Sequence, residues 1–451
     1  MKLLIVLIAL LFSSNALAGT VTGSLRYIKN WPGCRNGQPN SAMDCSKNGQ
    51  NLPLKNIYVE FRRTSDNVLI GDAKASASGV YSRSLPAGNY RMHLSYRDGT
   101  VGNGTSDLGT AGVALVSDIN AGLANVLTNQ VVSNIVVTSS GTAVVNYTVD
   151  SNSPTQVRER ANAYAGAMAQ QDVWEIIYGG SWFNNQPGSM YRVRIQPVTS
   201  NASGGARCPQ SNFDCVMGVR ASFTTGFDIL WHETGHGMQQ MLQIVLLGQT
   251  WSNGLSGCAN QTLGTAANSL IEGWADFVAT LTEYRPGTVP GNVYGNICGS
   301  CQYSPNNPQP NPSACGTDAI NRRRSAVARA LVDLVDTTAA DSGCVPETLA
   351  LSPATLLDAL AFFNGNGCVS SNGTCSGICG FSEGGVVESL CGNVNASWPY
   401  TGSNALPNSD QTSLLDFLGI LKTNFGVSGT QLRNIWASSC WQPGDSSVTL
   451  P

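Results

Sequence analysis

The chain has few charged residues. Asp, Glu, Lys and Arg together make up 12% of it, about half the share that is usual in soluble proteins. The formal net charge is only -3. A nucleic-acid-binding surface requires a concentrated basic field, so we expect no nucleic-acid partner. Apolar residues nevertheless account for 42% of the chain, which favours a folded protein over a disordered one.

Long apolar runs are also scarce. After the N-terminal region, no uninterrupted apolar stretch reaches the roughly 20 residues that a membrane-spanning helix needs, so we expect no membrane span. Met1 and Lys2 precede an apolar run over 3–12, and Ala16-Leu17-Ala18 follows it. This order predicts a cleavable signal peptide over 1–18, with a short membrane anchor as the alternative. We therefore expect a secreted, periplasmic or cell-surface protein.

Cysteine, by contrast, is plentiful. The chain has 14 cysteines, an even number, and in an exported protein this favours a disulfide framework. Cys34 with Cys45 and Cys208 with Cys215 are the pairings suggested by proximity, although sequence leaves the connectivity open. Cys298-Gly-Ser-Cys301 would also suit half of a thiolate zinc site or a redox motif. No second pair at zinc-ribbon spacing follows it, so disulfides are the favoured interpretation.

The pattern of apolar residues predicts a multidomain protein. From 19 to 152, short alternating runs separated by turn residues are typical of an antiparallel all-β sandwich. The loop over 31–48 reads as an insertion into it. Near 151–154 the pattern changes to helical spacing, so we place a mainly α (α+β) domain over 153–451. Its predicted helices cover 157–178, 226–247, 265–284, 318–336, 353–363 and 410–425, with a strand over 190–198 and a loop-rich stretch up to 220.

Two of the three histidines in the chain fall in one short motif. Trp231-His232-Glu233-Thr234-Gly235-His236 contains His-Glu-x-x-His within a helical pattern. Residues four apart lie on the same side of a helix, so His232 and His236 can share one tetrahedral ion. Glu233 lies beside that face, close enough to act on water without occupying a coordination position. A chance match on an ordinary amphipathic helix is the alternative.

The next predicted helix offers two carboxylates at the same spacing. Glu272 and Asp276 are four residues apart, and Gly273 and Ala275 leave room beside them for close backbone approach. Glu272 would complete the three protein ligands of a catalytic zinc, which keeps a fourth position open. The alternative is a solvated acidic face on a surface helix.

These residues resemble a known family. His232-Glu233-x-x-His236 followed by Glu272-x-x-x-Asp276 resembles the gluzincins, the thermolysin-like zinc metallopeptidases of the zincin fold. The resemblance implies that Glu272 is the third zinc ligand, that Glu233 is the general base, and that Asp276 orients an imidazole, most simply His232. No tyrosine lies between Gly237 and Glu272 to serve as the oxyanion stabiliser that the family uses. The candidates left open for that role are Tyr284, Tyr294, Tyr303, Arg322, Arg323 and Arg324.

A second resemblance concerns the N-terminal domain. Gly19-x-Val21-x-Gly23, Leu52-Pro-Leu-Lys-Asn56, Gly79-Val-Tyr81 and Leu85-Pro-x-Gly-x-Tyr90 follow one another. Their order resembles the transthyretin-like or carboxypeptidase-regulatory-like β-sandwich. We expect a targeting, docking or folding module here. His93, the remaining histidine, is interpreted as a strand or surface residue.

The sequence thus predicts a secreted zinc metallopeptidase with one catalytic Zn²⁺, in which Glu233 activates a zinc-bound water to cleave peptide bonds of extracellular protein. An endopeptidase is the first expectation, and an exopeptidase or an amidase acting on non-peptide substrates are alternatives. A surface adhesion or binding protein with a vestigial zinc site is a further hypothesis. Calcium at Asp333, Asp336 or Asp341 is a conceivable addition, but acids spaced along a helix are more commonly solvated.

Overall fold

The structure is a computed structural model, and it describes part of the chain. The described residues are 18–30, 49–99, 112–118, 125–178, 193–198, 203–207, 216–221, 230–236, 266–284, 324–335, 349–352, 355–356, 359 and 414–438. Two compact units divide the chain: unit 1 comprises Met1–Asn30, Lys47–Met168 and Ile195–Pro197, and unit 2 comprises Trp31–Ser46, Ala169–Arg194 and Val198–Pro451. The predicted domain boundary at 152/153 lies just before helix α2 (Thr155–Tyr178). The two units divide within that helix, between Met168 and Ala169.

Unit 1 contains a five-stranded sheet built around one long strand. Strand β1 (Ala18–Ile28) pairs with β5 (Val80–Pro86) and β2 (Asn51–Pro53) in antiparallel fashion, and with β9 (Thr142–Val144) and β10 (Tyr147–Val149) in parallel. Alternate residues of β1 are buried, as expected for a strand with one face on a core. Gly23 has no room for a side chain, because a Cβ there would collide with the carbonyl oxygen of Val145.

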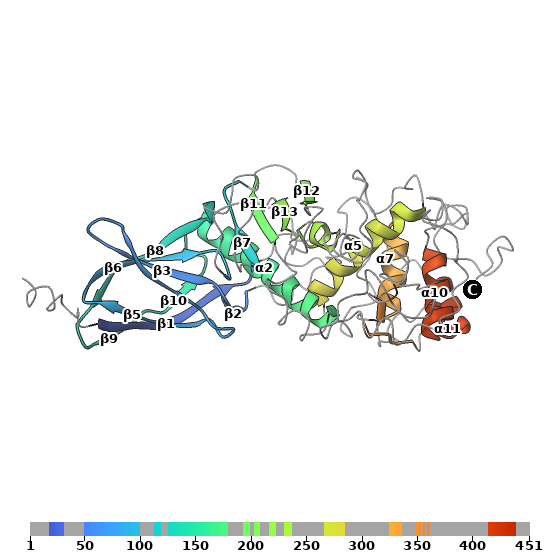
Figure 1. Cartoon of the computed structure of the whole chain (residues 1–451), viewed down its shortest axis with the longest axis horizontal. Helices are drawn as coiled ribbons and strands as arrows, with labels where there is room; N and C mark the ends of the chain where they lie inside the picture. Colours follow the sequence, from blue (N-terminus) through green and yellow to red (C-terminus); the bar gives the residue numbers. More distant parts are fainter. Residues whose placement is uncertain are drawn as a thin grey trace, which may run out of the picture. The chain divides into compact units, whose positions relative to one another are not determined.

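A four-stranded antiparallel sheet faces it. Its order is β4 (Leu69–Lys74), β3 (Tyr58–Arg63), β6 (Gly88–Ser95) and β8 (Thr128–Val137), and Figure 1 shows the two sheets as separate layers. The Phe61 ring lies 6.0 Å from that of Tyr81 in the other sheet, centroid to centroid. The Tyr81 hydroxyl is 3.3 Å from the sulfur of Met92. The prediction that the N-terminal part forms β-sheets is confirmed.

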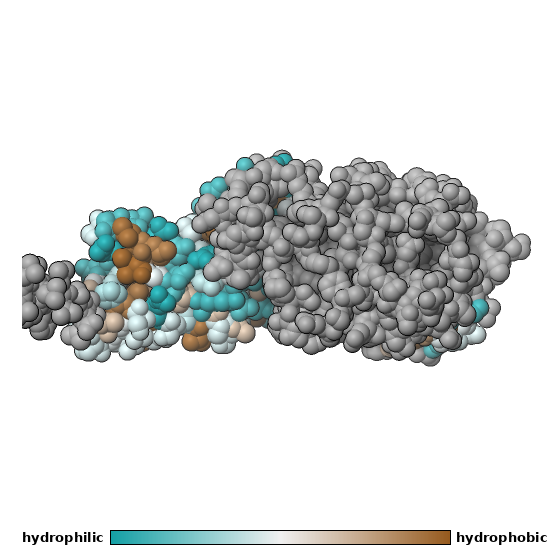
Figure 2. All heavy atoms as spheres, viewed as in Figure 1, coloured by the Kyte–Doolittle hydropathy of each residue, from teal (hydrophilic) through white to brown (hydrophobic). Residues whose placement is uncertain are grey.

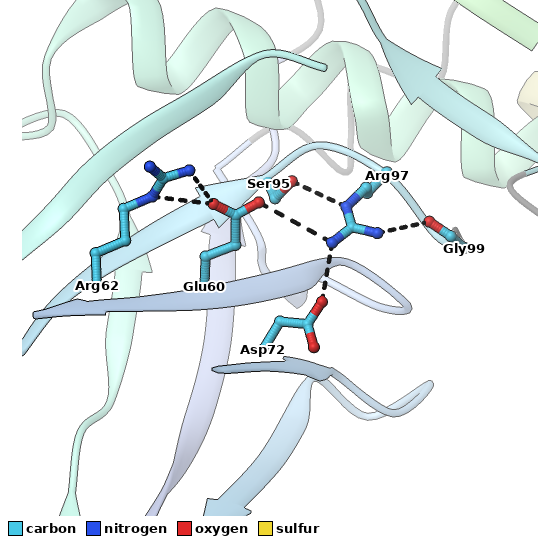
Figure 3. A network of polar contacts seen from close by, with 6 residues as sticks. All are labelled: Glu60, Arg62, Asp72, Ser95, Arg97 and Gly99. Carbon is cyan, nitrogen blue, oxygen red and sulfur yellow. Dashed lines mark hydrogen bonds and ion pairs between the residues drawn. The ribbon is translucent and has the colours of Figure 1, made fainter. Parts of the chain in front are cut away.

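The outer face of this second sheet carries a network of charged side chains (Figure 3). The carboxylate of Glu60, a residue only 6% exposed, accepts hydrogen bonds from Arg62 at 3.2 and 2.7 Å. Arg97 forms an ion pair with Asp72 at 3.0 Å and lies 4.0 Å from Glu60. Its guanidinium also stacks 4.2 Å from the ring centroid of Tyr58. A buried carboxylate requires such partners, since an unpaired buried charge is costly.

Helix α2 (Thr155–Tyr178) follows the sheets in sequence. Within unit 1, the Tyr96 hydroxyl donates to the carbonyl of Val157 at 3.4 Å. The Tyr96 and Tyr164 rings lie 6.5 Å apart. Arg160 donates to Asn129 at 3.1 Å. The predicted helix over 157–178 is confirmed, beginning two residues earlier than expected. Short strands β7 (Val113–Leu115) and β11 (Val193–Pro197) are linked within unit 1 by the Val116 amide, which donates to the carbonyl of Ile195 at 2.9 Å.

Unit 2 is mainly helical among its described residues. Helical turns cover 230–236, and the named helices are α5 (Ala266–Tyr284), α7 (Arg324–Asp333), α10 (Leu414–Phe425) and α11 (Gly429–Ser438). Helix α5 packs against α7 and also contacts α10. The predicted helix over 265–284 agrees closely with α5, and α10 ends where the predicted helix over 410–425 does. Helix α7 lies within the predicted 318–336, of which 318–323 and 336 fall outside the described residues. Helix α11 was not predicted.

The expectation of a loop-rich stretch up to residue 220 is wrong in part. Strands β12 (Ser203–Arg207) and β13 (Val216–Ala221) form an antiparallel pair there. The segment Ser-Gly-Gly-Ala-Arg of β12 has no apolar alternation and two glycines, so neither period nor propensity indicates a strand. Its hydrogen bonds come from a partner strand that local sequence does not reveal.

Several predictions fall outside the described residues. These are the signal peptide apart from Ala18, which begins β1, the insertion over 31–48, all fourteen cysteines and most of the predicted helix over 353–363. No described helix is both long and apolar enough to cross a membrane.

Apolar side chains also reach the described surface. Figure 2 shows brown, apolar patches on the N-terminal part. The large apolar residues exposed there are Val68, Leu69, Val80, Val136 and Val144.

Candidate metal centre

The predicted metal-binding motif lies on a helical segment that packs closely on α5. A Cβ placed on Gly235 would lie 2.9 Å from the Cα of Ala275 and 3.0 Å from its carbonyl oxygen. Real Cβ atoms essentially never come that close to backbone atoms, so only glycine permits this approach of the two helices. Because Gly235 follows His232 by three residues and Ala275 precedes Asp276, the contact brings the predicted site residues of both helices together.

The buried carboxylate of Asp276 holds the imidazole of His232. The Nδ1 atom of His232 lies 2.7 Å from Oδ1 of Asp276. Asp276 is 1% exposed and His232 is 9% exposed. With the Nδ1 proton donated to the carboxylate, Nε2 of His232 carries the lone pair of the ring, and this is the atom that a metal would use. The predicted pairing of Asp276 with His232 is therefore present in the structure.

The second histidine of the motif meets the first. The Nε2 atoms of His232 and His236 lie 3.1 Å apart, and their rings are 4.6 Å apart in an edge-on arrangement with an interplanar angle of 84°. The expectation that residues four apart on the helix converge is met by the geometry of the two rings. Two imidazole nitrogens this close share either a proton or a cation, because two facing lone pairs would repel each other.

The described side chains include that of Glu233 but not that of Glu272. Glu233 is half-buried, between the two histidines in sequence. Glu272 lies in α5 (Ala266–Tyr284), four residues before Asp276, but its side chain is outside the described residues. Among the side chains that are described, no three metal-binding groups gather at one point. The role of Glu272 as the third ligand stays a prediction.

Apolar residues close in sequence to His232 and Asp276 are buried. Trp231, Trp274 and Phe277 are each at most 1% exposed, and Val278 is fully buried. The Trp274 and Phe277 rings pack with centroids 5.3 Å apart. Electrostatic interactions are stronger in such a water-poor environment than in solution, so the contact between His232 and Asp276 is well protected from competition by solvent.

The other candidates of the sequence analysis divide into three groups. Asp333 is 2% exposed, so the expectation of a solvated acid is wrong for this residue, because α7 packs that part of its surface against other elements. Asp336 and Asp341 are outside the described residues, as are Tyr294, Tyr303, Arg322 and Arg323. Tyr284 ends α5 and Arg324 begins α7, with their side chains outside the described set.

One contribution to the site was missed by sequence reasoning. Gln170 of α2 is fully buried and hydrogen-bonds to the motif-bearing segment. It interrupts a buried stripe of apolar residues at helical spacing, formed by Ala163, Ala167 and Trp174. A glutamine in such a stripe is a signal that the sequence does contain, since a buried amide needs hydrogen-bond partners.

Comparisons of the chain with protein-family models, with curated proteins and with solved structures gave no match.

Proposed function

We propose that this protein is an exported zinc-dependent metallopeptidase of the gluzincin type. His232, His236 and Glu272 would hold one Zn²⁺, Glu233 would be the general base and Asp276 would orient His232. One observation carries the proposal: the Nε2 atoms of both histidines converge to 3.1 Å while a buried carboxylate binds the opposite nitrogen of His232 at 2.7 Å. These contacts suit the carboxylate and histidine parts of a carboxylate–histidine–zinc triad.

The separation of the two nitrogens fits zinc. Zn–N bonds of about 2.0–2.1 Å at a tetrahedral angle place two ligand nitrogens about 3.3 Å apart, close to the 3.1 Å found between the imidazoles. A hydrogen bond from His236 to His232 is the alternative for the same distance. Metal analysis separates the two, since only the first requires a cation.

The proposed roles of the residues rest on the family resemblance and on the contacts of His232. Zinc held here would acidify a bound water and polarise the scissile carbonyl. Glu233 would accept the proton from the attacking water and deliver it to the leaving amine. Asp276 keeps the proton of His232 on Nδ1, so that the ring offers Nε2 throughout the reaction. No side chain forms a covalent bond to the substrate in this scheme.

The two-sheet unit 1 supports the idea of a transthyretin-like accessory module. Its two facing sheets suit that class of sandwich, and the proposed role of the module is to dock substrate or assist folding. We propose that export places the whole protein in an oxidising compartment, where its cysteines form disulfides.

Replacement of Glu233 by Gln tests the central claim. The wild-type protein, purified from its secreted form, should contain about one zinc per chain and digest casein, and a chelator should stop digestion. Glu233→Gln should retain zinc and lose at least 10²-fold in kcat, because it removes general base catalysis. Glu159→Gln, the same chemical change on α2 in unit 1, should leave activity unchanged.

Two outcomes would contradict the proposal. A wild-type protein without zinc would remove the metal centre, and unchanged digestion by Glu233→Gln would remove the base. Zinc binding with no hydrolysis of any protein would favour the adhesive alternative with a vestigial site. Cleavage of an internally quenched peptide blocked at both ends would identify an endopeptidase, whereas cleavage only of peptides with free ends would identify an exopeptidase.

A further inference from the structure

The motif-bearing segment 230–236 is held from a second side by one buried glutamine. Gln170 of α2 has no exposed surface. Its Nε2 donates to the carbonyl oxygen of Trp231 at 2.7 Å, and its Oε1 accepts a hydrogen bond from the hydroxyl of Thr234. Both groups of the amide are therefore used, on the residues that flank His232 and Glu233 in sequence.

These contacts are specific to one face of the segment. The Thr234 hydroxyl also lies 2.8 Å from the carbonyl of Leu230, a common local acceptor for a helical threonine. The hydroxyl would therefore have an acceptor even without Gln170. The side-chain amide of Gln170 instead ties the segment 230–236 to α2. Because these groups are buried, their hydrogen bonds are stronger than they would be in water.

The tolerance of a metal site explains why a second attachment matters. Productive sites hold their ligands to within about 0.5 Å and 10–20°. A ring nitrogen about 6 Å from a helix axis moves by about 1 Å when the helix turns by 10°, given a Cα radius of about 2.3 Å. The contact of Gly235 with Ala275 and the hydrogen bond of His232 to Asp276 both join the segment to α5, so they oppose its rotation from one side only.

We propose that Gln170 is a positioning residue for the metal centre. Its two hydrogen bonds set the rotation and axial position of the segment 230–236, so that the Nε2 atoms of His232 and His236 face a common point. This inference rests on the proposed function, because its consequence is a change in metal binding. Gln170 does not touch substrate or metal, and it acts through the backbone of Trp231 and the side chain of Thr234.

The test is metal binding by the full-length protein with Gln170 replaced by Met, which keeps the side-chain volume and removes both hydrogen bonds. The affinity for Co²⁺, measured by competition with a chelator, should fall about tenfold, the lower end of the range for lost outer-shell contacts. At saturating Co²⁺, the visible absorption bands of Gln170→Met should also shift, because the ligand geometry changes. A purely structural role would lower the melting temperature without moving these bands.

A matched control lies next to it on the same helix. Gln171 is also buried, but its Oε1 has no hydrogen-bond partner among the described residues. Gln171→Met should therefore leave the Co²⁺ affinity within about twofold of wild type, since it removes no contact to the motif.

A second pair of variants keeps the test valid if Gln170→Met does not fold. Thr234→Val keeps the shape and removes the hydroxyl, so it should weaken Co²⁺ binding. Thr234→Ser restores the hydroxyl and should restore the affinity. In the double variant Gln170→Met/Thr234→Val the loss should be smaller than the product of the single losses, because both changes break the same contact.

Each result bears on one claim. Wild-type Co²⁺ affinity and an unchanged spectrum in Gln170→Met would overturn the positioning role and leave the zinc centre intact. Equal losses in Thr234→Val and Thr234→Ser would also overturn it, since the hydroxyl would then be irrelevant. A wild-type protein that binds no Co²⁺ or zinc would remove the proposed function and this inference with it.

Discussion

At the residue scale, His93 should make the stability of the fold depend on pH. It lies on β6 opposite Glu60, and its Nε2 atom is buried without a hydrogen-bond partner among the described residues. Burial lowers the pKa of His93, the charges of Arg62 and Arg91 lower it further, and Glu60 partly opposes them. The folded protein therefore resists protonation of this ring more than the unfolded chain does.

The sign of the resulting pH effect follows from linkage. Above the ordinary histidine pKa of about 6.5, the ring is neutral in both states and costs nothing. As the pH falls through that value, the unfolded chain binds the proton first, so the free energy of unfolding decreases until the folded ring is protonated too.

We expect His93→Gln to lose less stability than wild type between pH 7.5 and pH 5. Urea unfolding of both proteins at each pH, followed by a signal from unit 1, measures this difference. At pH 7.5 and above, the gap between the two proteins should not vary with pH, which serves as the control. An equal acid loss in both would mean that His93 titrates alike in the folded and unfolded chains.

At the scale of elements, a single glycine sets how closely two helices approach. Gly235→Ala would gain about 1 kcal/mol in intrinsic helix propensity. It would also place a methyl group 2.9 Å from the backbone of Ala275, which no side-chain rotation can relieve. Overpacking of this kind costs about 1–3 kcal/mol, so the steric term exceeds the propensity gain.

The expected result of Gly235→Ala is a protein destabilised by up to about 2 kcal/mol that also binds zinc more weakly. Chemical unfolding and zinc competition measure the two effects, and Gly235→Ser should be at least as severe. A Gly235→Ala protein more stable than wild type would show that the helices can separate without loss.

The outcome of the helix predictions has an elementary physical basis. Helix α10 ends at Phe425, as predicted. Gly426 follows it with a φ of +68°, the conformation that commonly terminates helices at glycine. Helix α5 was predicted nearly to its ends from its apolar spacing. Only three residues separate the end of α10 from the start of α11, so the apolar pattern of α11 could not be told apart from that of a loop after α10.

At the scale of the whole molecule, metal binding should be coupled to folding. Zinc that binds only the folded chain stabilises it by about 2.7 kcal/mol at a free concentration of 100 times Kd. Calorimetry of the full-length protein should show that zinc raises the melting temperature and that a chelator lowers it. The unfolded chain lacks the convergence of His232 and His236 on which such binding depends.

The three histidines supply matched variants for this measurement. His236→Gln should abolish the shift in melting temperature caused by zinc. His93→Gln, in unit 1, should retain it in full, and magnesium should not replace zinc, because imidazole nitrogens are poor ligands for that ion. A zinc shift that persists in His236→Gln would place the ion at some other site.

The sequence by itself determined the strand-rich character of the N-terminal part, several helices and the pairing of His232 with His236, because these depend on periodicities of two and 3.6 residues along one segment. It also suggested Asp276 as the partner of His232 through a resemblance. Only the tertiary structure decided that Gly235 lets two helices touch, that Gln170 reaches the motif and that β12 pairs with β13. Such contacts join residues distant in sequence, and burial and hydrogen bonding between them arise only once the chain is packed.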